Sequence, residues 1–275
     1  MKPLASLSKN DLRPIKAVLT DIDDTLTTDG RLTSSAYNAL EALKSAGFII
    51  IPVTGRCAGW CDHIARMWPV DAIVGENGAF YFRYDHASKT MHRHFSQAEE
   101  QRLLNAEKLQ ALRAEIESSV PGSAVASDQD YRICDLAVDV AEDVTPLSAD
   151  EIKRIVALTE DAGAVAKISS IHVNCWFGEH SKLSASLKTL DECFGIDKEH
   201  IQNEVLFVGD SPNDATMFRY FDFSIGVANI LNFVDFLTDR PTYITENCAG
   251  RGFSEIADRL LDARGCSYSQ TDLAK

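Results

Sequence analysis

The sequence predicts an α/β protein in which a parallel β-sheet with crossover helices is interrupted by an inserted α+β module. Three observations support this class. Short apolar runs alternate with amphipathic stretches at the start of the chain, the same alternation returns after about residue 180, and the segment between them has a different order of elements. Alternating strands and helices are typical of a parallel sheet, because each parallel connection needs a crossover.

The first part of the parallel sheet is expected near the N-terminus. Residues 16–22, KAVLTDI, form a short apolar run that ends in acids, which is typical of a buried parallel strand. Residues 34–46 carry alanine and leucine at helical spacing, and Gly47 is suited to end that helix. The next elements are expected in the order strand, helix and strand, at residues 48–55, 57–67 and 71–79.

The middle of the chain does not continue this alternation. A capping box of Ser148 and Glu151 marks the start of one of its helices. The expected elements are two strands within 80–95, a long polar helix at 97–118, a strand at 131–140, a helix at 148–161 and a long strand at 164–177. This order predicts an α+β module rather than another turn of the parallel sheet.

The last part of the chain returns to the first pattern. Three helices are expected: one at 181–194, one directly after the turn SPND, and one from roughly Ser254 to Ala263. Strands are expected at 204–210, 223–229 and 242–247. The predicted organisation is therefore a core domain in two parts, 1–82 and 179–275, with a cap domain at 83–178 inserted between them.

Composition limits the partners that the chain can have. The 275 residues carry a formal net charge of -14 and no clustered run of Lys and Arg, which argues against nucleic acid and anionic membranes. No stretch of about 18 apolar residues occurs, and the N-terminus lacks the apolar core of a signal peptide. The seven cysteines form no C-x-x-C pair. We expect a cytoplasmic protein whose partner is a small molecule; the sequence does not indicate the oligomeric state.

Acidic residues follow the predicted parallel strands. Asp21 and Asp23 lie at the carboxyl end of the first strand, and Asp210 and Asp214 lie at the carboxyl end of the strand at 204–210. Because ligands bind beyond the carboxyl ends of parallel strands, we expect these carboxylates to share one small space. Crowded carboxylates repel one another unless a cation lies among them, and oxygen ligands favour magnesium. The sequence thus predicts a magnesium site, and magnesium binds phosphate oxygens well.

A carboxylate beside magnesium can act as a covalent nucleophile toward a phosphoryl group. Asp21 fits that role because it ends the strand. Asp23 lies two residues further on and points to the same side if the chain stays extended. It can protonate the leaving oxygen and later activate water.

Four motifs stand in a specific order along the chain. They are D-x-D-x-T at Asp21, T-G-R at Thr54, a downstream lysine at Lys182, and G-D-x-x-N-D ending at Asp214. Together they resemble the haloacid dehalogenase superfamily of phosphatases, and the inserted module resembles the large cap of subclass IIB. The resemblance covers nearly all of the chain after residue 15. It implies a Rossmann-like parallel-sheet core with an α+β cap, and a magnesium-dependent phosphatase acting on a small phosphorylated metabolite, with sugar phosphates favoured.

The resemblance also implies roles for the residues of the first three motifs. Asp21 would be the nucleophile and a metal ligand. Asp23 would be the general acid and base and would offer its backbone carbonyl to magnesium. Thr54 would hydrogen-bond the transferring phosphoryl group, and Lys182 would neutralise its oxygens and Asp21.

In the last motif, Asp210 would bind magnesium directly, and Asp214 would bind it directly or through water. Asn213 would orient Lys182 or the phosphate. The family's usual glycine after the first acid is Ser211 here, followed by Pro212. We expect this change to be tolerated, because the turn stays short.

Further residues are expected to contact the substrate. Gly55 and Arg56 belong to the second motif, and Arg132 is another candidate cation. Asn77 lies in the turn GENGA, near the expected junction with the cap, and is either a turn residue or a substrate contact.

In the cap, His172 and Asn174 alternate with Trp176 on one predicted strand, so all three face one way. Their side chains either face solvent or line the substrate cavity. The sequence leaves both interpretations open.

Two other functions fit part of the pattern. A phosphomutase would use the same scaffold, but it needs a cluster of cap arginines for a second phosphate, and the arginines here are scattered. A phospho-accepting signalling receiver would be about half this length and would have its acid pair first. A dehalogenase would lack Asp23. Hydrolysis of a phosphate ester is the favoured function.

Overall fold

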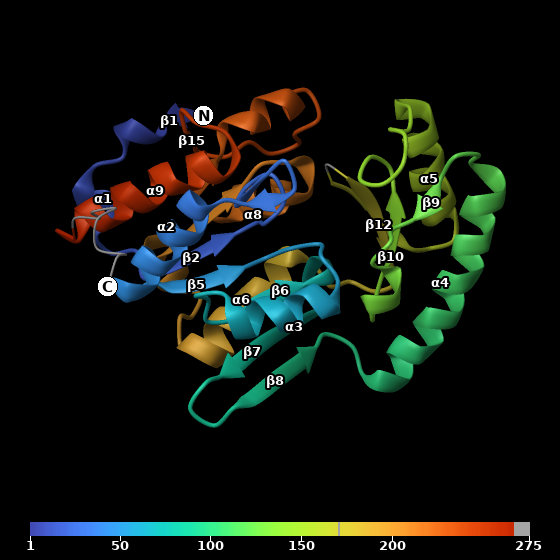
Figure 1. The fold of residues 1–275 in the computed structure, drawn as a ribbon, viewed down its shortest axis with the longest axis horizontal. Helices are drawn as coiled ribbons and strands as arrows, with labels where there is room; N and C mark the ends of the chain where they lie inside the picture. Colours follow the sequence, from blue (N-terminus) through green and yellow to red (C-terminus); the bar gives the residue numbers. More distant parts are fainter. Residues whose placement is uncertain (170, 267–275) are drawn as a thin grey trace. The chain divides into compact units, whose positions relative to one another are not determined.

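The computed structural model describes residues 1–169 and 171–266 (Figure 1). They form two compact units. The first unit comprises Met1–Val53, Met67–Ala72 and the described residues from Ser186 onward; the second comprises Thr54–Arg66 and the described residues of Ile73–Ala185. The domain boundaries expected at 82/83 and 178/179 divide the chain differently, and they remain a prediction.

A six-stranded sheet forms the centre of the first unit. Its strand order is β1-β15-β14-β13-β2-β5, and every pairing is parallel. The residues of β2 and β13 are all buried, which explains why their sequences AVLT and VLFVG show no polar alternation. The strands are β1 Lys2–Pro3, β15 Tyr243–Ile244, β14 Phe223–Gly226, β13 Val205–Gly209, β2 Ala17–Thr20 and β5 Ile49–Pro52.

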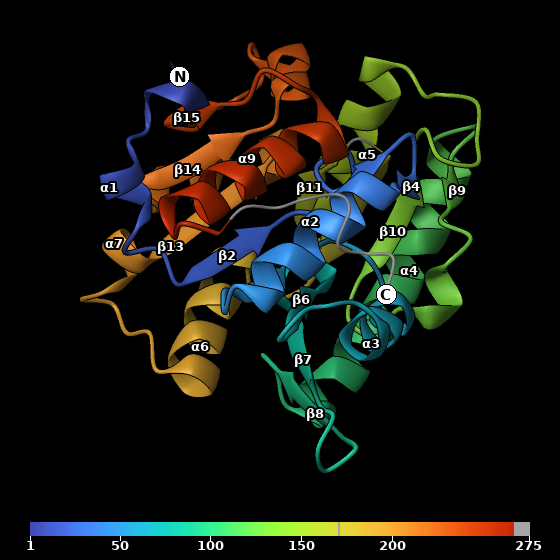
Figure 2. The same cartoon turned by 60° about the vertical axis from the view of Figure 1, so that its left-hand side comes forward.

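Helices α2 (Ser34–Ser45) and α9 (Ala249–Ala263) pack side by side in this unit (Figures 1 and 2). Thr33 caps α2 by accepting a hydrogen bond from the backbone N–H of Ala36, and Gly47 follows its end in a left-handed conformation. Helix α9 begins five residues before the predicted start, because two glycines in its first turn hide the helical signal. The other elements are α1 Lys9–Leu12, α7 Ile201–Glu204, α8 Ala215–Tyr220, and the short hairpin of β3 Thr27–Thr28 and β4 Arg31–Leu32; α6 Lys182–Phe194 begins in the second unit.

The second unit contains an antiparallel sheet in the order β11-β12-β10-β9. Helices α4 (Glu99–Ser119) and α5 (Ala149–Asp161) pack against it, and the predicted capping box at the start of α5 is confirmed. The strands are β9 Ala124–Val125, β10 Leu136–Asp139, β11 Val165–Ile168 and β12 His172–Trp176. The core between helices and sheet is built from aliphatic side chains that include Leu109, Leu112, Ile116, Leu136, Val138, Ile155, Leu158 and Val173.

The long strand expected at 164–177 is wrong: these residues form the hairpin of β11 and β12, in which Val165 pairs with Trp176. The side chain of Ser169 accepts a hydrogen bond from the backbone N–H of His172 and so stabilises the reversal. Residue 170 lies outside the described residues. Strand β12 is fully buried, whereas β11 is an edge strand with exposed residues.

The second unit also holds a three-stranded sheet, β6-β7-β8, and helix α3 (Ala58–Met67) precedes it in the chain. The strands are β6 Ile73–Gly75, β7 Phe80–Asp85 and β8 Thr90–Phe95. The sequence predicted that β6 would join the parallel sheet. Instead it pairs antiparallel with β7, because the 3-10 turn Glu76–Gly78 reverses the chain. The β7–β8 hairpin occurs where it was expected.

Candidate active site

Two acids lie at the ends of neighbouring parallel strands in the first unit. Strands β2 and β13 pair with Thr20 opposite Val208, and the backbone N–H of Asp21 donates to the carbonyl of Val208 at 2.9 Å. Asp210 follows the end of β13. The two residues are 4% and 1% exposed. The parallel register therefore brings together two residues that are far apart in the sequence, as the strand-end pattern predicted.

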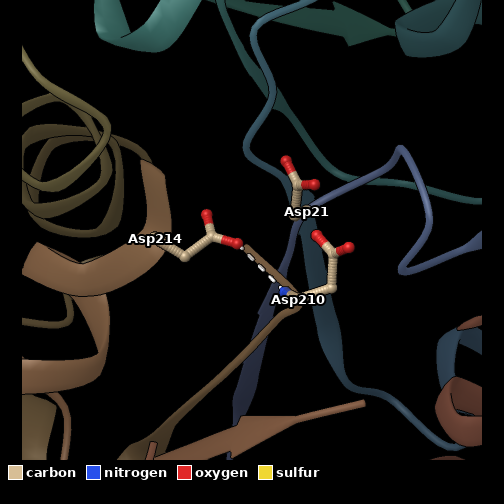
Figure 3. Close-up of side chains that lie close together, drawn as sticks. All are labelled: Asp21, Asp210 and Asp214. Carbon is tan, nitrogen blue, oxygen red and sulfur yellow. Dashed lines mark hydrogen bonds between the residues drawn. The ribbon is translucent and has the colours of Figure 1, made fainter. Parts of the chain in front are cut away.

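Asp214 joins this pair through a tight turn. The 3-10 turn Pro212–Asp214 begins with proline, which suits the first helical position, so the SPND sequence is accommodated as expected. The carboxylate of Asp214 accepts a hydrogen bond from the backbone N–H of Asp210 at 3.1 Å (Figure 3). Gly209 leaves room for it, since a Cβ there would lie 2.3 Å from Oδ2 of Asp214. Asn213 accepts a hydrogen bond from the hydroxyl of Ser211 at 2.8 Å.

The three carboxylates form a group that fits a divalent cation. One oxygen from each of Asp21, Asp210 and Asp214 lies within 4.8 Å of the other two, and all three residues are buried (Figure 3). Buried like charges at this spacing repel one another unless a cation or protons neutralise them. A donor set made only of oxygen favours a hard ion such as magnesium. Among the described residues this group does not include Asp23, which is only partly buried.

Asn229 is a site residue that the sequence analysis missed. Its Nδ2 donates to the backbone carbonyl of Asp24 and to Oδ2 of Asp210, both at 2.9 Å. Its Oδ1 accepts from the backbone N–H of Ala249 at 2.9 Å. The signal was available, because Asn229 follows a strand of the same sheet and the strand-end rule applied to it as well.

The loop after β2 is held in a fixed turn. Asp24 adopts a left-handed conformation with φ of 55°, and its N–H donates to Oγ1 of Thr27. The hydroxyl of Thr27 donates to the carbonyl of Ile22. Asp23 lies inside this turn. Its position relative to a substrate therefore depends on the hydrogen bonds of its neighbours.

The second motif lies in the second unit, where five of the predicted residues lie close together. Thr54 is fully buried, its Oγ1 accepts from the N–H of Arg56, and its carbonyl accepts from the N–H of Asn77. A Cβ on Gly55 would lie 3.1 Å from Nδ2 of Asn77 and 3.3 Å from Oδ1 of Asn174. The two asparagines thus flank Gly55. Asn77 adopts a left-handed conformation in the turn, with φ of 54°.

Arg132 belongs to a buried charge network, so its candidacy as a substrate contact is wrong. Its side chain is 0% exposed and donates to Asp128, to Asp135 and to the carbonyl of Gly55. Asp135 also accepts a hydrogen bond from Nδ2 of Asn174 at 3.0 Å. The guanidinium therefore supports the backbone of the second motif from within the unit.

Glu76 is a second buried ionisable residue, which the sequence indicated only as part of a turn. Its carboxylate accepts hydrogen bonds from the backbone N–H groups of Ala58, Ile133 and Cys134 at 2.6 to 3.2 Å. Burial, and then the charge of Asp135, raise the pKa of Glu76 to about 8. The carboxyl group joins segments that are more than fifty residues apart.

Both cap residues predicted from the alternation on β12 are buried. His172 is 2% exposed and Asn174 is 3% exposed, so the solvent-exposed reading of this strand face is wrong. His172 contacts Glu142, which also contacts Arg56.

Lys182 is the first residue of α6 and is 3% exposed, unlike an ordinary surface lysine. The turn before it is closely packed. Gly78 has φ of +102°, and a Cβ there would lie 2.1 Å from the backbone carbonyl oxygen of Ser181. The GENGA turn thus contacts the backbone just before Lys182.

Among the described helices, none has the length and apolar character that a membrane span requires.

Comparison with known proteins supports one family. Residues 18–132 match the model of the haloacid dehalogenase-like hydrolases. The chain is 28% identical over 251 residues to phosphoglycolate phosphatase 1 of Saccharolobus solfataricus, covering 90% of this chain and 96% of that protein.

Solved structures share the fold at lower identity. A protein of Thermoplasma acidophilum superimposes with a TM-score of 0.66 and 18% identity, over 90% of this chain and 98% of that one. A sugar phosphatase of subclass IIB superimposes with a TM-score of 0.60 and 17% identity, over 91% of this chain and 99% of that one.

The fold is that of a Rossmann-like core combined with an α+β cap. Residues 18–132 thus resemble the haloacid dehalogenase-like hydrolases, and the similarity to a phosphatase over most of the chain supports a phosphatase activity.

Proposed function

We propose that this hydrolase is a magnesium-dependent phosphatase that acts on a small phosphorylated metabolite through an aspartyl-phosphate on Asp21. The observation that carries the proposal is the group of three buried carboxylates, Asp21, Asp210 and Asp214, with oxygens within 4.8 Å of one another. The mutual repulsion of such a group favours a bound cation, and a cation there would allow a carboxylate to approach an anionic phosphoryl group.

Asp210, Asp214 and Asp21 would hold the magnesium ion, which would supply charge compensation to the phosphoryl oxygens when bound. In the first step a carboxylate oxygen of Asp21 forms a bond to phosphorus, and the bond from phosphorus to the ester oxygen breaks. Asp23 gives its proton to the leaving alkoxide, which departs as an alcohol.

In the second step water attacks the phosphorus of the aspartyl-phosphate. Asp23 takes the proton of that water, inorganic phosphate leaves, and the carboxylate of Asp21 is restored. Thr54 and Lys182 would bind phosphoryl oxygens in both steps, the lysine by its charge and the threonine by its hydroxyl. Asn213 would help to orient the bound phosphate.

Two substrate classes are supported. Sugar phosphates are favoured by the large cap and by the fold shared with a sugar phosphatase. Phosphoglycolate is the second candidate, because the Saccharolobus relative is named for it. Asn77, Asn174, Arg56 and His172 are the residues we propose to contact the part of the substrate beyond the phosphate. We further propose that the enzyme acts in the cytoplasm, which suits its seven free cysteines.

The test is phosphate release from a panel of sugar phosphates, phosphorylated acids, nucleotides and p-nitrophenyl phosphate, with and without magnesium. We expect release from one or a few members only when magnesium is present. Asp21→Asn keeps the shape of the side chain and removes the nucleophile, so it should abolish turnover and leave the circular dichroism spectrum unchanged. Wild-type activity in Asp21→Asn would exclude the covalent mechanism.

A further inference from the structure

Glu142 contacts two buried basic side chains in the second unit, those of Arg56 and His172. Its Oε1 lies 2.9 Å from Nη2 of Arg56, and its Oε2 lies 2.9 Å from Nε2 of His172. The side chains of Arg56 and His172 are 6% and 3% exposed, whereas that of Glu142 is 27% exposed. The Glu142 side chain therefore contacts both partners and remains partly accessible to a ligand.

The placement of Glu142 is fixed by the turn that carries it. Asp139, at the end of β10, is 1% exposed and accepts hydrogen bonds from the N–H groups of Ala141, Glu142 and Asp143 at 3.0, 2.8 and 2.9 Å. Asp139 is also paired with His172 in the β10–β12 ladder. A carboxylate held by a preformed turn opposite its partner strand loses little conformational entropy when it makes these contacts.

Opposite charges face each other within this cluster. An arginine side chain stays protonated in proteins, and the guanidinium of Arg56 also stacks over the ring of Trp60 at 4.5 Å. The contact with His172 and the charge of Arg56 lower the pKa of Glu142 to about 2, against the opposing effect of burial. Glu142 is therefore ionised at neutral pH, and its negative charge matches the positive charge of Arg56.

We propose that Glu142 determines substrate choice: while its carboxylate holds Arg56 and His172, the cluster accepts a hydroxyl-bearing group and rejects a carboxylate. The inference rests on the proposed function, in which Arg56 and His172 contact the part of the substrate beyond the phosphate. It names sugar or polyol phosphates, rather than phosphorylated acids, as the preferred class.

The physical reason is the difference between the two ligand groups. A hydroxyl can donate to an oxygen of Glu142 and accept from a neighbouring N–H donor, so it adds hydrogen bonds without adding charge. A substrate carboxylate finds Arg56 already paired with Glu142 and faces the negative charge of that partly exposed side chain. Juxtaposed like charges are a strong means of rejecting a wrong partner.

The experiment compares two matched substrate pairs in which one group changes. Glycerol 3-phosphate is compared with 3-phosphoglycerate, and 2-hydroxyethyl phosphate with 2-phosphoglycolate. For each, kcat/KM is measured with magnesium for the wild type, for Glu142→Gln and for Asp143→Asn. The last variant is the control, because it removes one charge from the same turn without touching the cluster.

We expect Glu142→Gln to raise the ratio of kcat/KM for acid over hydroxyl substrate by roughly tenfold or more, chiefly through a lower KM for the acid. Asp143→Asn should leave the ratio at the wild-type value. If Glu142→Gln does not fold, Glu142→Asp serves instead. It keeps the charge but withdraws it from the two partners, and the ratio should rise by a smaller factor.

Two results would overturn the inference in different ways. A wild-type enzyme that hydrolyses both members of a pair, with a ratio that Glu142→Gln leaves unchanged, would exclude the specificity role and leave the phosphatase intact. Failure of every variant to release phosphate from any substrate of the larger panel would instead remove the proposed function itself, and the specificity role with it.

Discussion

The side-chain amide of Asn229 holds the carboxylate of Asp210 at 2.9 Å and at the same time the backbone carbonyl of Asp24, also at 2.9 Å. One amide group thus connects the acid after β13 with the turn after β2. Groups that orient a metal ligand affect metal affinity almost as much as the ligands themselves. Asn229 is therefore a positioning residue for the proposed magnesium site.

Asn229→Ala should weaken magnesium binding by about 10-fold to 100-fold, because Asp210 loses the donor that orients it. Isothermal titration of the protein with magnesium measures this without any substrate. Asn203→Ala is the matched control, since Asn203 is exposed in the same unit and should bind magnesium like the wild type. Equal affinity in the two variants would show that Asp210 needs no support from Asn229.

Gly209 is the residue whose missing side chain makes room for Asp214. Gly209→Ala would place a Cβ 2.3 Å from Oδ2 of Asp214, so the carboxylate must move and its hydrogen bond from the N–H of Asp210 must break. We expect weaker magnesium binding and a loss of about 1–3 kcal/mol in the free energy of unfolding. Magnesium titration and urea unfolding measure the two effects.

The control is Gly226→Ala, at the position paired with Gly209 on the neighbouring strand β14. The atoms nearest to a Cβ there would be apolar, at 2.9 Å in Pro241 and 3.0 Å in Ile230. It should lower stability to a similar extent but leave magnesium affinity unchanged. Parallel losses of metal affinity in both variants would mean that general destabilisation, rather than displacement of Asp214, is the cause.

The group of three carboxylates was predictable because the sequence signal for each of them is local. An acid at the end of a buried run is visible in the sequence, and parallel pairing places such ends at one edge of the sheet. That reasoning identified Asp21, Asp210 and Asp214. It omitted Asn229 because the predicted strand at 223–229 includes this residue, whereas β14 ends at Gly226 and Asn229 follows it.

The buried network of the second unit was not predictable in the same way. Glu76 accepts hydrogen bonds from the backbone N–H groups of Ile133 and Cys134, which lie 57 and 58 positions further along the chain. No periodicity in the sequence indicates such a pairing. Arg132 was a candidate substrate contact in the sequence, because the spacing of its partners Asp128 and Asp135 does not indicate an ion-pair network. Strand β6 was assigned to the parallel sheet because its composition matches a buried strand of either kind.

Glu76 makes stability depend on pH. Its pKa of about 8 in the folded protein lies above the ordinary value of 4.5, because of burial and the charge of Asp135. The folded state then binds the proton more tightly than the unfolded state. This contribution to stability is complete below about pH 4.5 and is lost as the pH rises toward about 8.

The free energy of unfolding should therefore fall by a few kcal/mol between about pH 5 and pH 8, measured by urea unfolding at constant ionic strength. Glu76→Gln should remove most of that slope. It should also lower stability at the acidic end, because its NH₂ group would face backbone N–H donors of Ala58 or Cys134. The exposed Glu115 supplies the control, Glu115→Gln, which should keep the wild-type slope. A wild-type protein with flat stability over this range would contradict the titration of Glu76.

The proposed role of Asp23 as general acid and base predicts different behaviour in the two chemical steps. A general acid would be needed to expel an alkoxide, but p-nitrophenolate leaves without a proton, so with that substrate only the second step would depend on Asp23. Asp23→Asn should therefore give a burst of p-nitrophenol close to one equivalent per enzyme, followed by turnover reduced by about 10²–10⁴-fold. Rapid mixing with p-nitrophenyl phosphate measures both, and no burst should occur with a sugar phosphate. Asp29→Asn, at an exposed left-handed position that asparagine tolerates, should behave like the wild type. Steady turnover of p-nitrophenyl phosphate at the wild-type rate in Asp23→Asn would assign the proton transfer to another group.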